Sequence, residues 1–129
     1  MEFCTGWLVL LLVCTVLTQA DPVCKHCKCT ETTIDCRSSN LVHHPNASDW
    51  PTDMVVTDVV MDNNYLVHVK QYPQMAVLRL SLRSCNIVHI DDQAFLHLQN
   101  LTELDLSYND ITTANLNAAV FQVKTSFSR

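Results

Sequence analysis

The chain has 129 residues, which is about the length of one domain, and a formal net charge of −5. Its mild acidity argues against a nucleic-acid partner, because that class of protein needs a basic surface. The only glycine is Gly6, so the rest of the chain cannot supply a glycine-rich phosphate loop. No GxSxG or HExxH motif is present, and the sequence therefore predicts a protein that is not an enzyme and uses no cofactor.

The first twenty residues have the features of a secretory signal peptide. Trp7 to Leu17 is an apolar run of eleven residues, whereas a membrane span takes roughly 20. Small residues precede an expected cleavage site before Asp21. The residues before the run contain no Lys or Arg, which leaves an uncleaved membrane anchor as the alternative. We expect residues 1–20 to be a signal and the mature form to be secreted without a membrane span, although a longer form of the protein would be free to carry an anchor.

Four cysteines lie close together at the start of the expected mature chain: Cys24, Cys27, Cys29 and Cys36. In a secreted protein such a cluster predicts a disulfide framework. Four cysteines allow three pairings, and their spacing does not distinguish among them. The thiolates, with His26 between them, also form a possible zinc site, so a small metal-binding secreted protein is the alternative. Directly after the cluster, Thr33 to Arg37 predicts a first parallel strand.

The stretch from His43 to Pro51 contains two prolines and several small polar residues, which predict an irregular connection. We expect the His43-His44 pair to lie in this solvated loop and Trp50 to cover the core. Asn46-Ala47-Ser48 is a glycosylation sequon, and Asn100-Leu101-Thr102 is a second one. Both asparagines are candidate glycan sites, with unused triplets as the alternative.

Three stretches of the chain repeat one another. Val77–Ile87 and Leu101–Ile111 are the clearest copies, and Val56–Leu66 is a weaker one. Each fits the template L-x-x-L-x-L-x-x-N/C-x-L, which is typical of repeats of roughly 20–29 residues that each supply one short strand. The turn position holds Asn64, Cys85 and Asn109, with intervals of 85 − 64 = 21 and 109 − 85 = 24 residues. We expect about three repeats in residues 43–121, asparagine amides that bond the turn backbone, and a small buried thiol at Cys85.

Alternate residues of the expected strands should face outward on a concave side. Matching the register of neighbouring strands predicts three rows: Thr33–Asp58–Arg79–Glu103, Asp35–Val60–Ser81–Asp105 and Arg37–Asp62–Arg83–Ser107. Opposite charges in the first and third rows predict ladders of ion pairs. This surface either docks a protein or is a solvated sheet whose charges satisfy one another. The candidate partner-binding residues are Asp58, Arg79, Glu103, Asp62, Arg83, Asp105 and, at the edge, Tyr108.

The remaining segments are less regular. Ile90 to Leu98 has apolar residues at roughly helical spacing, which predicts a short helix or 3₁₀ segment. After Ile111 the repeat pattern decays, and we expect no further strand. Residues 122–129 are expected to form an uncapped or disordered tail, either because the chain is a shortened form of a longer repeat protein or because its end folds back as an improvised cap. The histidines are scattered along the sequence, and no metal site is predicted from them.

The repeats and the cysteine cluster together resemble the extracellular leucine-rich repeat proteins that carry a cysteine-rich N-terminal cap. The resemblance covers roughly Cys24 to Phe121. It implies an α/β solenoid with short parallel strands on the concave side and irregular or 3₁₀ returns on the convex side. It assigns residues 21–42 to the cap and pairs Cys24 with Cys29 and Cys27 with Cys36. The function it implies is non-catalytic recognition of a protein ligand, as in receptors, adhesion proteins or immune factors; a truncated product without a binding function is the alternative.

Overall fold

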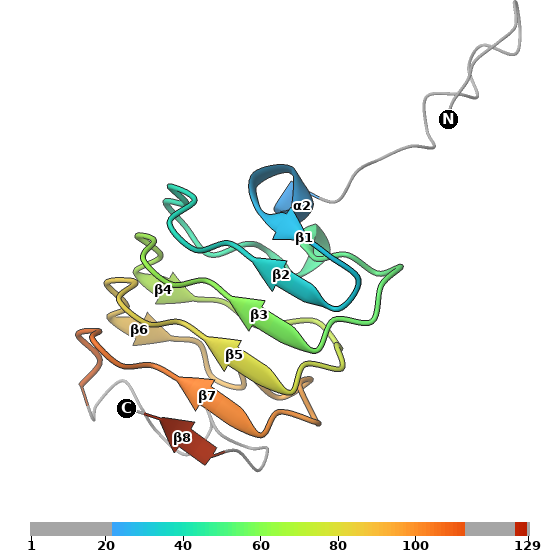
Figure 1. The fold of residues 1–129 in the computed structure, drawn as a ribbon. Coiled ribbons are helices and arrows are strands. Elements are labelled where there is room, and N and C mark those ends of the chain that lie inside the picture. Colours follow the sequence, from blue (N-terminus) through green and yellow to red (C-terminus); the bar gives the residue numbers. More distant parts are fainter. Residues whose placement is uncertain (1–21, 113–125, 129) are drawn as a thin grey trace, which may run out of the picture.

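The computed structural model describes residues 22–112 and 126–128. Short strands line up in a six-stranded sheet in the order β1-β2-β3-β5-β7-β8 (Figure 1). The first pair, β1 and β2, is antiparallel, and every later pair in this sheet is parallel. The strands of the sheet are β1 Lys28–Cys29, β2 Thr33–Asp35, β3 Asp58–Val60, β5 Arg79–Ser81, β7 Glu103–Asp105 and β8 Ser126–Ser128.

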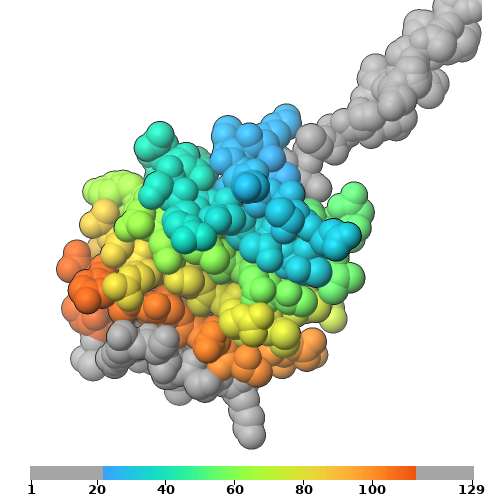
Figure 2. Space-filling view, in the orientation of Figure 1, coloured from blue at the N-terminus to red at the C-terminus, as the bar shows by residue number. Residues whose placement is uncertain are grey.

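A second, two-stranded parallel sheet lies behind the first (Figure 1). It consists of β4 (His68–Val69) and β6 (His89–Ile90), which belong to the returns that follow β3 and β5. The coils that begin with β3 and β5 therefore pass through the main sheet and then through the rear sheet. Successive turns appear as bands stacked from the N-terminal to the C-terminal end (Figure 2). The rear sheet was not anticipated from the sequence.

The core is built around the central residues of β2, β3, β5 and β7. Ile34, Val59, Leu80 and Leu104 are register partners along the sheet, and each is at most 2% exposed. One strand cannot bury such a residue alone, so the coils have to stack. Burying a side chain of this size stabilises the fold by about 1.5–3 kcal/mol. The repeated apolar spacing of the sequence thus becomes a continuous column of buried side chains.

Three aromatic side chains complete the core on the side of the returns. Trp50, Tyr72 and Phe95 are each at most 1% exposed. The Trp50 and Tyr72 ring centroids lie 5.1 Å apart, and those of Tyr72 and Phe95 lie 6.1 Å apart. The burial of Trp50 is as predicted, because it covers the aliphatic column where the returns leave a wide gap. Burial also raises the pKa of the Tyr72 hydroxyl well above its ordinary value.

The expectation that both histidines of the 43–51 connection are solvated is wrong for one of them. His43 is exposed, but His44 is fully buried. The His44 ring lies edge-on to Tyr72, with 4.8 Å between centroids, and its Nδ1 is 2.9 Å from the Pro45 carbonyl oxygen. Adjacent side chains diverge on an extended backbone, so one ring points to solvent and the other into the aromatic cluster. The short 3₁₀ turn η2 (Ala47–Asp49) follows directly.

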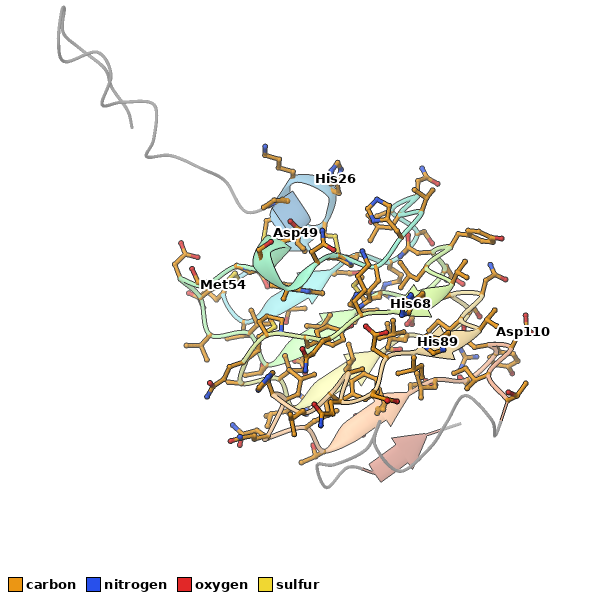
Figure 3. The ribbon with its side chains drawn as sticks, turned by 180° about the vertical axis from the view of Figure 1, so that it is seen from behind. His26, Asp49, Met54, His68, His89 and Asp110 are labelled. Carbon is orange, nitrogen blue, oxygen red and sulfur yellow. A yellow bond between two sulfur atoms is a disulfide. The ribbon has the colours of Figure 1, made fainter. Side chains whose placement is uncertain are left out.

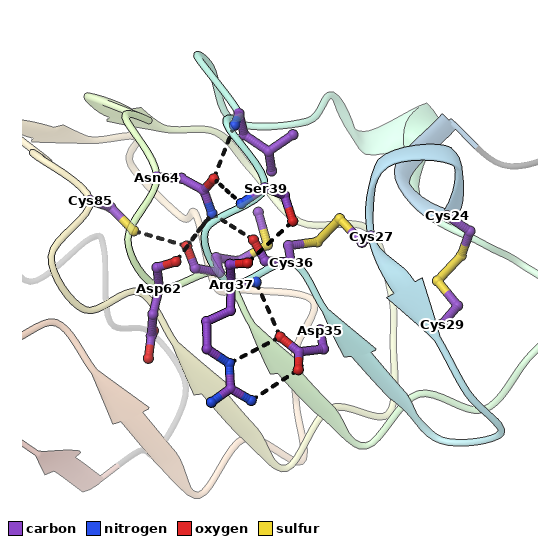
Figure 4. The surroundings of a disulfide bond; sticks show 12 residues. Cys24, Cys27, Cys29, Asp35, Cys36, Arg37, Ser39, Asp62, Asn64 and Cys85 are labelled. Atoms are coloured by element: carbon purple, nitrogen blue, oxygen red, sulfur yellow. Dashed lines mark hydrogen bonds and ion pairs between the residues drawn. A yellow bond between two sulfur atoms is a disulfide. The ribbon is translucent and has the colours of Figure 1, made fainter.

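The N-terminal end of the sheet is closed by α2 (Pro22–His26) and β1. Two disulfides hold this cap, Cys24–Cys29 and Cys27–Cys36, which is the pairing implied by the resemblance (Figure 4). Cys36 is fully buried at the end of β2, so the second bridge ties the cap directly to the core. Since all four thiols are bonded to one another, the alternative zinc site in the cap is contradicted.

Two further expectations need correction. Of the short helix or 3₁₀ segment expected over Ile90 to Leu98, the helix is wrong, because residues 92–97 form turns. Backbone bonds such as Ala94 N–H to Asp91 O, 3.1 Å, and Leu96 N–H to Gln93 O, 3.1 Å, join residues three apart, which is the 3₁₀ spacing. The expectation that no strand follows Ile111 is also wrong, because β8 pairs in parallel with β7. The last strand edge of the repeats therefore has a backbone partner.

Candidate binding surface

The outward side chains of the main sheet form the surface that was expected to be concave. We call this surface the sheet face. Its residues come from alternate positions of β2, β3, β5 and β7, and the register places them in two rows. These residues are Thr33, Asp35, Asp58, Val60, Arg79, Ser81, Glu103 and Asp105. The first two predicted rows are therefore present in the structure.

One predicted charge contact on the sheet face is formed as an ion pair. Arg79 Nε lies 2.8 Å from Asp58 Oδ1, and Arg79 Nη2 donates to Asp58 Oδ2 at 3.3 Å. The pair joins the neighbouring strands β3 and β5. Both side chains remain partly exposed, so the pair contributes about 0–1 kcal/mol to stability. It orients the Arg79 guanidinium across the sheet toward β3.

The predicted ladder Arg37–Asp62–Arg83 is not formed. Asp62 Oδ1 instead accepts hydrogen bonds from the Ser81 hydroxyl, at 2.6 Å, and from the Arg83 backbone N–H, at 3.0 Å. Arg37 pairs with Asp35 on its own strand, with Nη2 2.9 Å from Oδ2. Short polar groups of the next coil thus bond Asp62 Oδ1 in place of the guanidinium groups.

The Asp35–Arg37 pair has a clear electrostatic signature. Asp35 also accepts a hydrogen bond from the Arg37 backbone N–H, at 3.1 Å. The Arg37 side-chain hydrogen bond is the largest cause that lowers the pKa of the Asp35 carboxyl below its ordinary value, and the backbone bond adds to it. The same side-chain bond raises the pKa of the Arg37 guanidinium. Asp35 is therefore a fixed negative charge at the cap end of the sheet face.

A different arrangement occurs at the same end of the strands in the later coils. The Arg83 guanidinium carbon lies 4.4 Å from the centroid of the Tyr108 ring, a cation–π contact between neighbouring coils. Arg83 Nη1 is also 3.4 Å from Ser107 Oγ and 4.0 Å from Asp105 Oδ2. Tyr108 remains 73% exposed. The predicted edge aromatic is therefore present, solvent-facing, and stacked against an arginine.

The centre of the sheet face is hollowed. An open hollow of about 460 Å³ lies over β2, β3, β5 and β7. Its polar lining comes from both rows of the sheet face: Thr33, Asp58, Arg79, Ser81, Glu103 and Asp105. The hollow runs across four neighbouring strands rather than between side chains of one loop.

The turns that leave the strands are held by the predicted asparagines. Asn64 is 7% exposed; its Oδ1 accepts from Ser39 N–H and Leu41 N–H at 3.1 and 3.0 Å (Figure 4). Its Nδ2 donates to the carbonyls of Cys36 and Met61 at 2.8 and 2.7 Å. The Asn64 amide therefore joins two successive coils.

Asn109 repeats this pattern two coils later. Its Oδ1 accepts from Cys85 N–H and Ile87 N–H at 2.8 and 2.9 Å, and its Nδ2 donates to Leu82 O at 2.7 Å. At the intermediate position Cys85 is a buried free thiol whose Sγ lies 3.1 Å from Met61 O. Burial raises the pKa of the Cys85 thiol, which makes it a structural rather than a reactive cysteine.

A left-handed backbone residue precedes the turn position of every coil. Ser38, Asn63, Ser84 and Tyr108 have φ of 50°, 60°, 55° and 58°. Ser and Asn accept this conformation at small cost because their short polar side chains bond locally, whereas a large side chain costs about 1 kcal/mol or more. Tyr108 is the one large residue among these four. Its ring makes the contact with Arg83, and Val67 and Gln93 are other large residues with positive φ, at 62° and 61°.

Residues 77–122 match the family model described as Leucine rich repeat. The match supports a leucine-rich repeat protein. It covers β5, β6 and β7, where the sequence copies are clearest, and the cap disulfides fit the cysteine-rich flank of such proteins. A leucine-rich repeat domain suggests protein–protein interaction. Comparisons with curated proteins and with solved structures each found no match.

Three residues outside the sheet face come together without having been predicted. His68, His89 and Asp91 each place one potential ligand atom within 4.8 Å of the others. The signal was available, because 89 − 68 = 21 equals the interval between the turn positions Asn64 and Cys85. Residues separated by one repeat occupy the same place in adjacent coils. The prediction that the histidines are scattered is therefore wrong for His68 and His89, which occupy equivalent positions of adjacent coils.

Proposed function

We propose that this chain forms a secreted leucine-rich repeat solenoid that recognises a protein ligand through the sheet face, without catalysis. The observation that carries the proposal is Tyr108 with Arg83 stacked on its ring. Tyrosine and arginine are the residues most often found at the energetic centres of protein interfaces. Here Arg83 lies 4.0 Å from Asp105, a residue that lines the hollow, and Tyr108 is stacked on Arg83.

The backbone of Tyr108 strengthens this interpretation. Its counterparts in the other coils are Ser38, Asn63 and Ser84, which suit a left-handed backbone better. Conformational strain that folding does not require is often found at functional positions. The exposed ring, 73% accessible, contributes little to the core in return. Binding of a partner is the role that fits an exposed, strained and oriented aromatic residue.

Replacing Tyr108 with asparagine tests the binding role without damaging the fold. We expect stability to change by less than about 1 kcal/mol, because relief of strain offsets the lost cation–π contact. Binding to a partner found in a panel of purified cell-surface and secreted ectodomains should weaken at least about tenfold. Surface plasmon resonance measures the affinity and urea unfolding measures the stability.

The matched control is Tyr65→Asn. Tyr65 is 59% exposed and follows the turn position Asn64 of an earlier coil, whereas Tyr108 precedes its turn position and carries the contact with Arg83. Tyr65→Asn should leave binding within about twofold. If the two tyrosine variants bind the partner equally well, or if no ectodomain in the panel binds the chain, the proposal is wrong.

Secretion is the second part of the proposal. Residues 1–20 have signal-peptide character, two disulfides close the cap, and the sequon asparagines Asn46 and Asn100 are both exposed. In the described part of the chain no helix has the length and apolar character needed to cross a membrane. Expressed in animal cells, the protein should appear in the medium with Asp21 as its N-terminus and lose mass on treatment with an N-glycosidase. Retention of residues 1–20 in a membrane fraction would contradict this.

A further inference from the structure

The rear sheet places two histidines side by side. In the β4–β6 pair His68 is the register partner of His89, and Val69 is the partner of Ile90. Val69 and Ile90 are at most 1% exposed, so the histidines one residue earlier point the opposite way, to the outside. Figure 3 shows His68 and His89 on neighbouring strands of this rear surface. Their ring centroids are 4.7 Å apart.

Asp91 adds a carboxylate to this pair. Its Oδ1 lies 2.6 Å from His68 Nε2 and 3.8 Å from His89 Nε2. All three side chains are partly exposed, at 45% for His68, 54% for His89 and 38% for Asp91. One carboxylate oxygen thus faces two imidazole nitrogens from adjacent coils.

The positions of the three residues are set by the backbone. His89 N–H donates to Val67 O at 3.2 Å and Asp91 N–H donates to Val69 O at 3.0 Å. These ladder bonds fix the separation of the two coils at the spacing of parallel strands. The side chains therefore need only rotate to bring their ligand atoms together, and no backbone movement is required.

We propose that His68, His89 and Asp91 bind a divalent transition-metal ion, Zn²⁺, on the rear surface. Zn²⁺ takes imidazole nitrogen and carboxylate oxygen at about 2.0–2.2 Å, so ligand atoms of a tetrahedral site lie about 3.3 Å apart. The two separations from Asp91 Oδ1 lie on either side of that value. Three protein ligands leave a fourth position open to water, as in many exposed zinc sites.

The donor set also decides which ions fit. Two imidazoles favour Zn²⁺, Cu²⁺ or Ni²⁺, whereas Mg²⁺ and Ca²⁺ prefer oxygen ligands. The competing interpretation is an ion pair in which Asp91 simply accepts a hydrogen bond from His68. In an ion pair only His68 is at hydrogen-bond distance from Asp91, at 2.6 Å, whereas His89 lies at 3.8 Å. A metal ion uses both, and it would also link the coil that carries β4 to the coil that carries β6.

Isothermal titration calorimetry of the full disulfide-bonded chain with ZnCl₂ tests the proposal. We expect saturable binding of one Zn²⁺, and MgCl₂ at the same concentration should give none. Because each substitution removes a ligand, His68→Ala, His89→Ala and Asp91→Asn should each weaken binding at least about tenfold. His97→Ala is the matched control, since His97 is an exposed histidine outside the cluster; it should change the affinity less than twofold.

X-ray absorption at the zinc edge separates this site from binding elsewhere. Nitrogen and oxygen ligands near 2.0–2.1 Å are expected, whereas a sulfur ligand near 2.3 Å would indicate the Cys85 thiol. The proposal is overturned by sulfur ligation, by absence of saturable Zn²⁺ binding, or by equal affinity of the parent chain and His89→Ala. The unfolding midpoint of the parent chain should rise with added ZnCl₂, and that of His89→Ala should not.

Discussion

Replacing Asn64 with alanine should destabilise the protein by about 3 kcal/mol. The side-chain amide is the common partner of two backbone N–H groups and of carbonyls on two coils. Its removal leaves these groups without a partner in a place that is 7% exposed, where each unpaired group costs about 1–3 kcal/mol. Small rearrangements and entering water recover part of that cost, so the total is less than the sum. Urea unfolding followed by circular dichroism measures the change.

Asn64→Asp distinguishes hydrogen bonding from packing. Aspartate has nearly the same volume but no N–H to donate to the carbonyls of Cys36 and Met61. We expect it to lose at least as much stability as alanine, because its carboxylate would face those carbonyl oxygens. A loss below about 0.5 kcal/mol for Asn64→Asp would show that volume alone matters. Asn100→Ala, at an exposed asparagine, serves as the control and should change stability by less than about 0.5 kcal/mol.

The parallel strands of the main sheet could be predicted because each sequence repeat forms one coil, and equivalent residues lie side by side in neighbouring strands. A repeat puts equivalent residues at the same place in each coil, so spacing alone placed Asp58 beside Arg79 and Leu80 beside Leu104. The roles of Asn64 and Asn109 followed for the same reason, since every coil needs its turn groups satisfied. Wherever the repeat is regular, its spacing in the sequence predicts which residues of neighbouring strands pair.

The contacts that could not be predicted are those in which several partners compete. Register placed Asp62 between Arg37 and Arg83, but the Ser81 hydroxyl and a backbone N–H are shorter and less costly to order. Side-chain entropy makes long exposed ion pairs weak, so short polar groups win. Strand β8 pairs in a region where the repeat pattern has decayed, so periodicity offered no sign of it. Register fixes positions along the sheet, not the choice among nearby partners.

Acidification should destabilise the protein through His44, and this is the second large effect that we expect. Burial is the largest cause of a lowered pKa of the His44 imidazole, to about 3, with smaller contributions from Lys70 and His68 in the same direction. The Pro45 carbonyl and Asp91 act in the opposite direction. His44 Nδ1 lies 2.9 Å from Pro45 O and 3.3 Å from the Lys70 backbone nitrogen, whereas Nε2 is buried without a hydrogen-bond partner. The core therefore accommodates the neutral ring better than the charged one.

The direction of the pH effect follows from linkage. The unfolded chain protonates this histidine near pH 6.5, whereas the folded chain does so only near its lowered pKa of about 3. The contribution is therefore fully present above pH 6.5 and is lost progressively as the pH falls from there toward 3. Relative to neutral pH, the loss of stability amounts to about 2 kcal/mol at pH 5 and about 4–5 kcal/mol at pH 3. Other groups add their own pH dependence, so a comparison of variants is needed to isolate it.

His44→Gln provides that comparison, because glutamine stays neutral and its amide N–H can donate to the Pro45 carbonyl. The variant should be less stable than the parent chain at pH 7.5. Between pH 7.5 and pH 5, however, its free energy of unfolding should fall by about 2 kcal/mol less than that of the parent chain. His43→Gln, at the exposed neighbouring histidine, should keep the slope of the parent chain. Equal slopes for His44→Gln and the parent chain in urea unfolding at the two pH values would show that His44 is not buried in its neutral form.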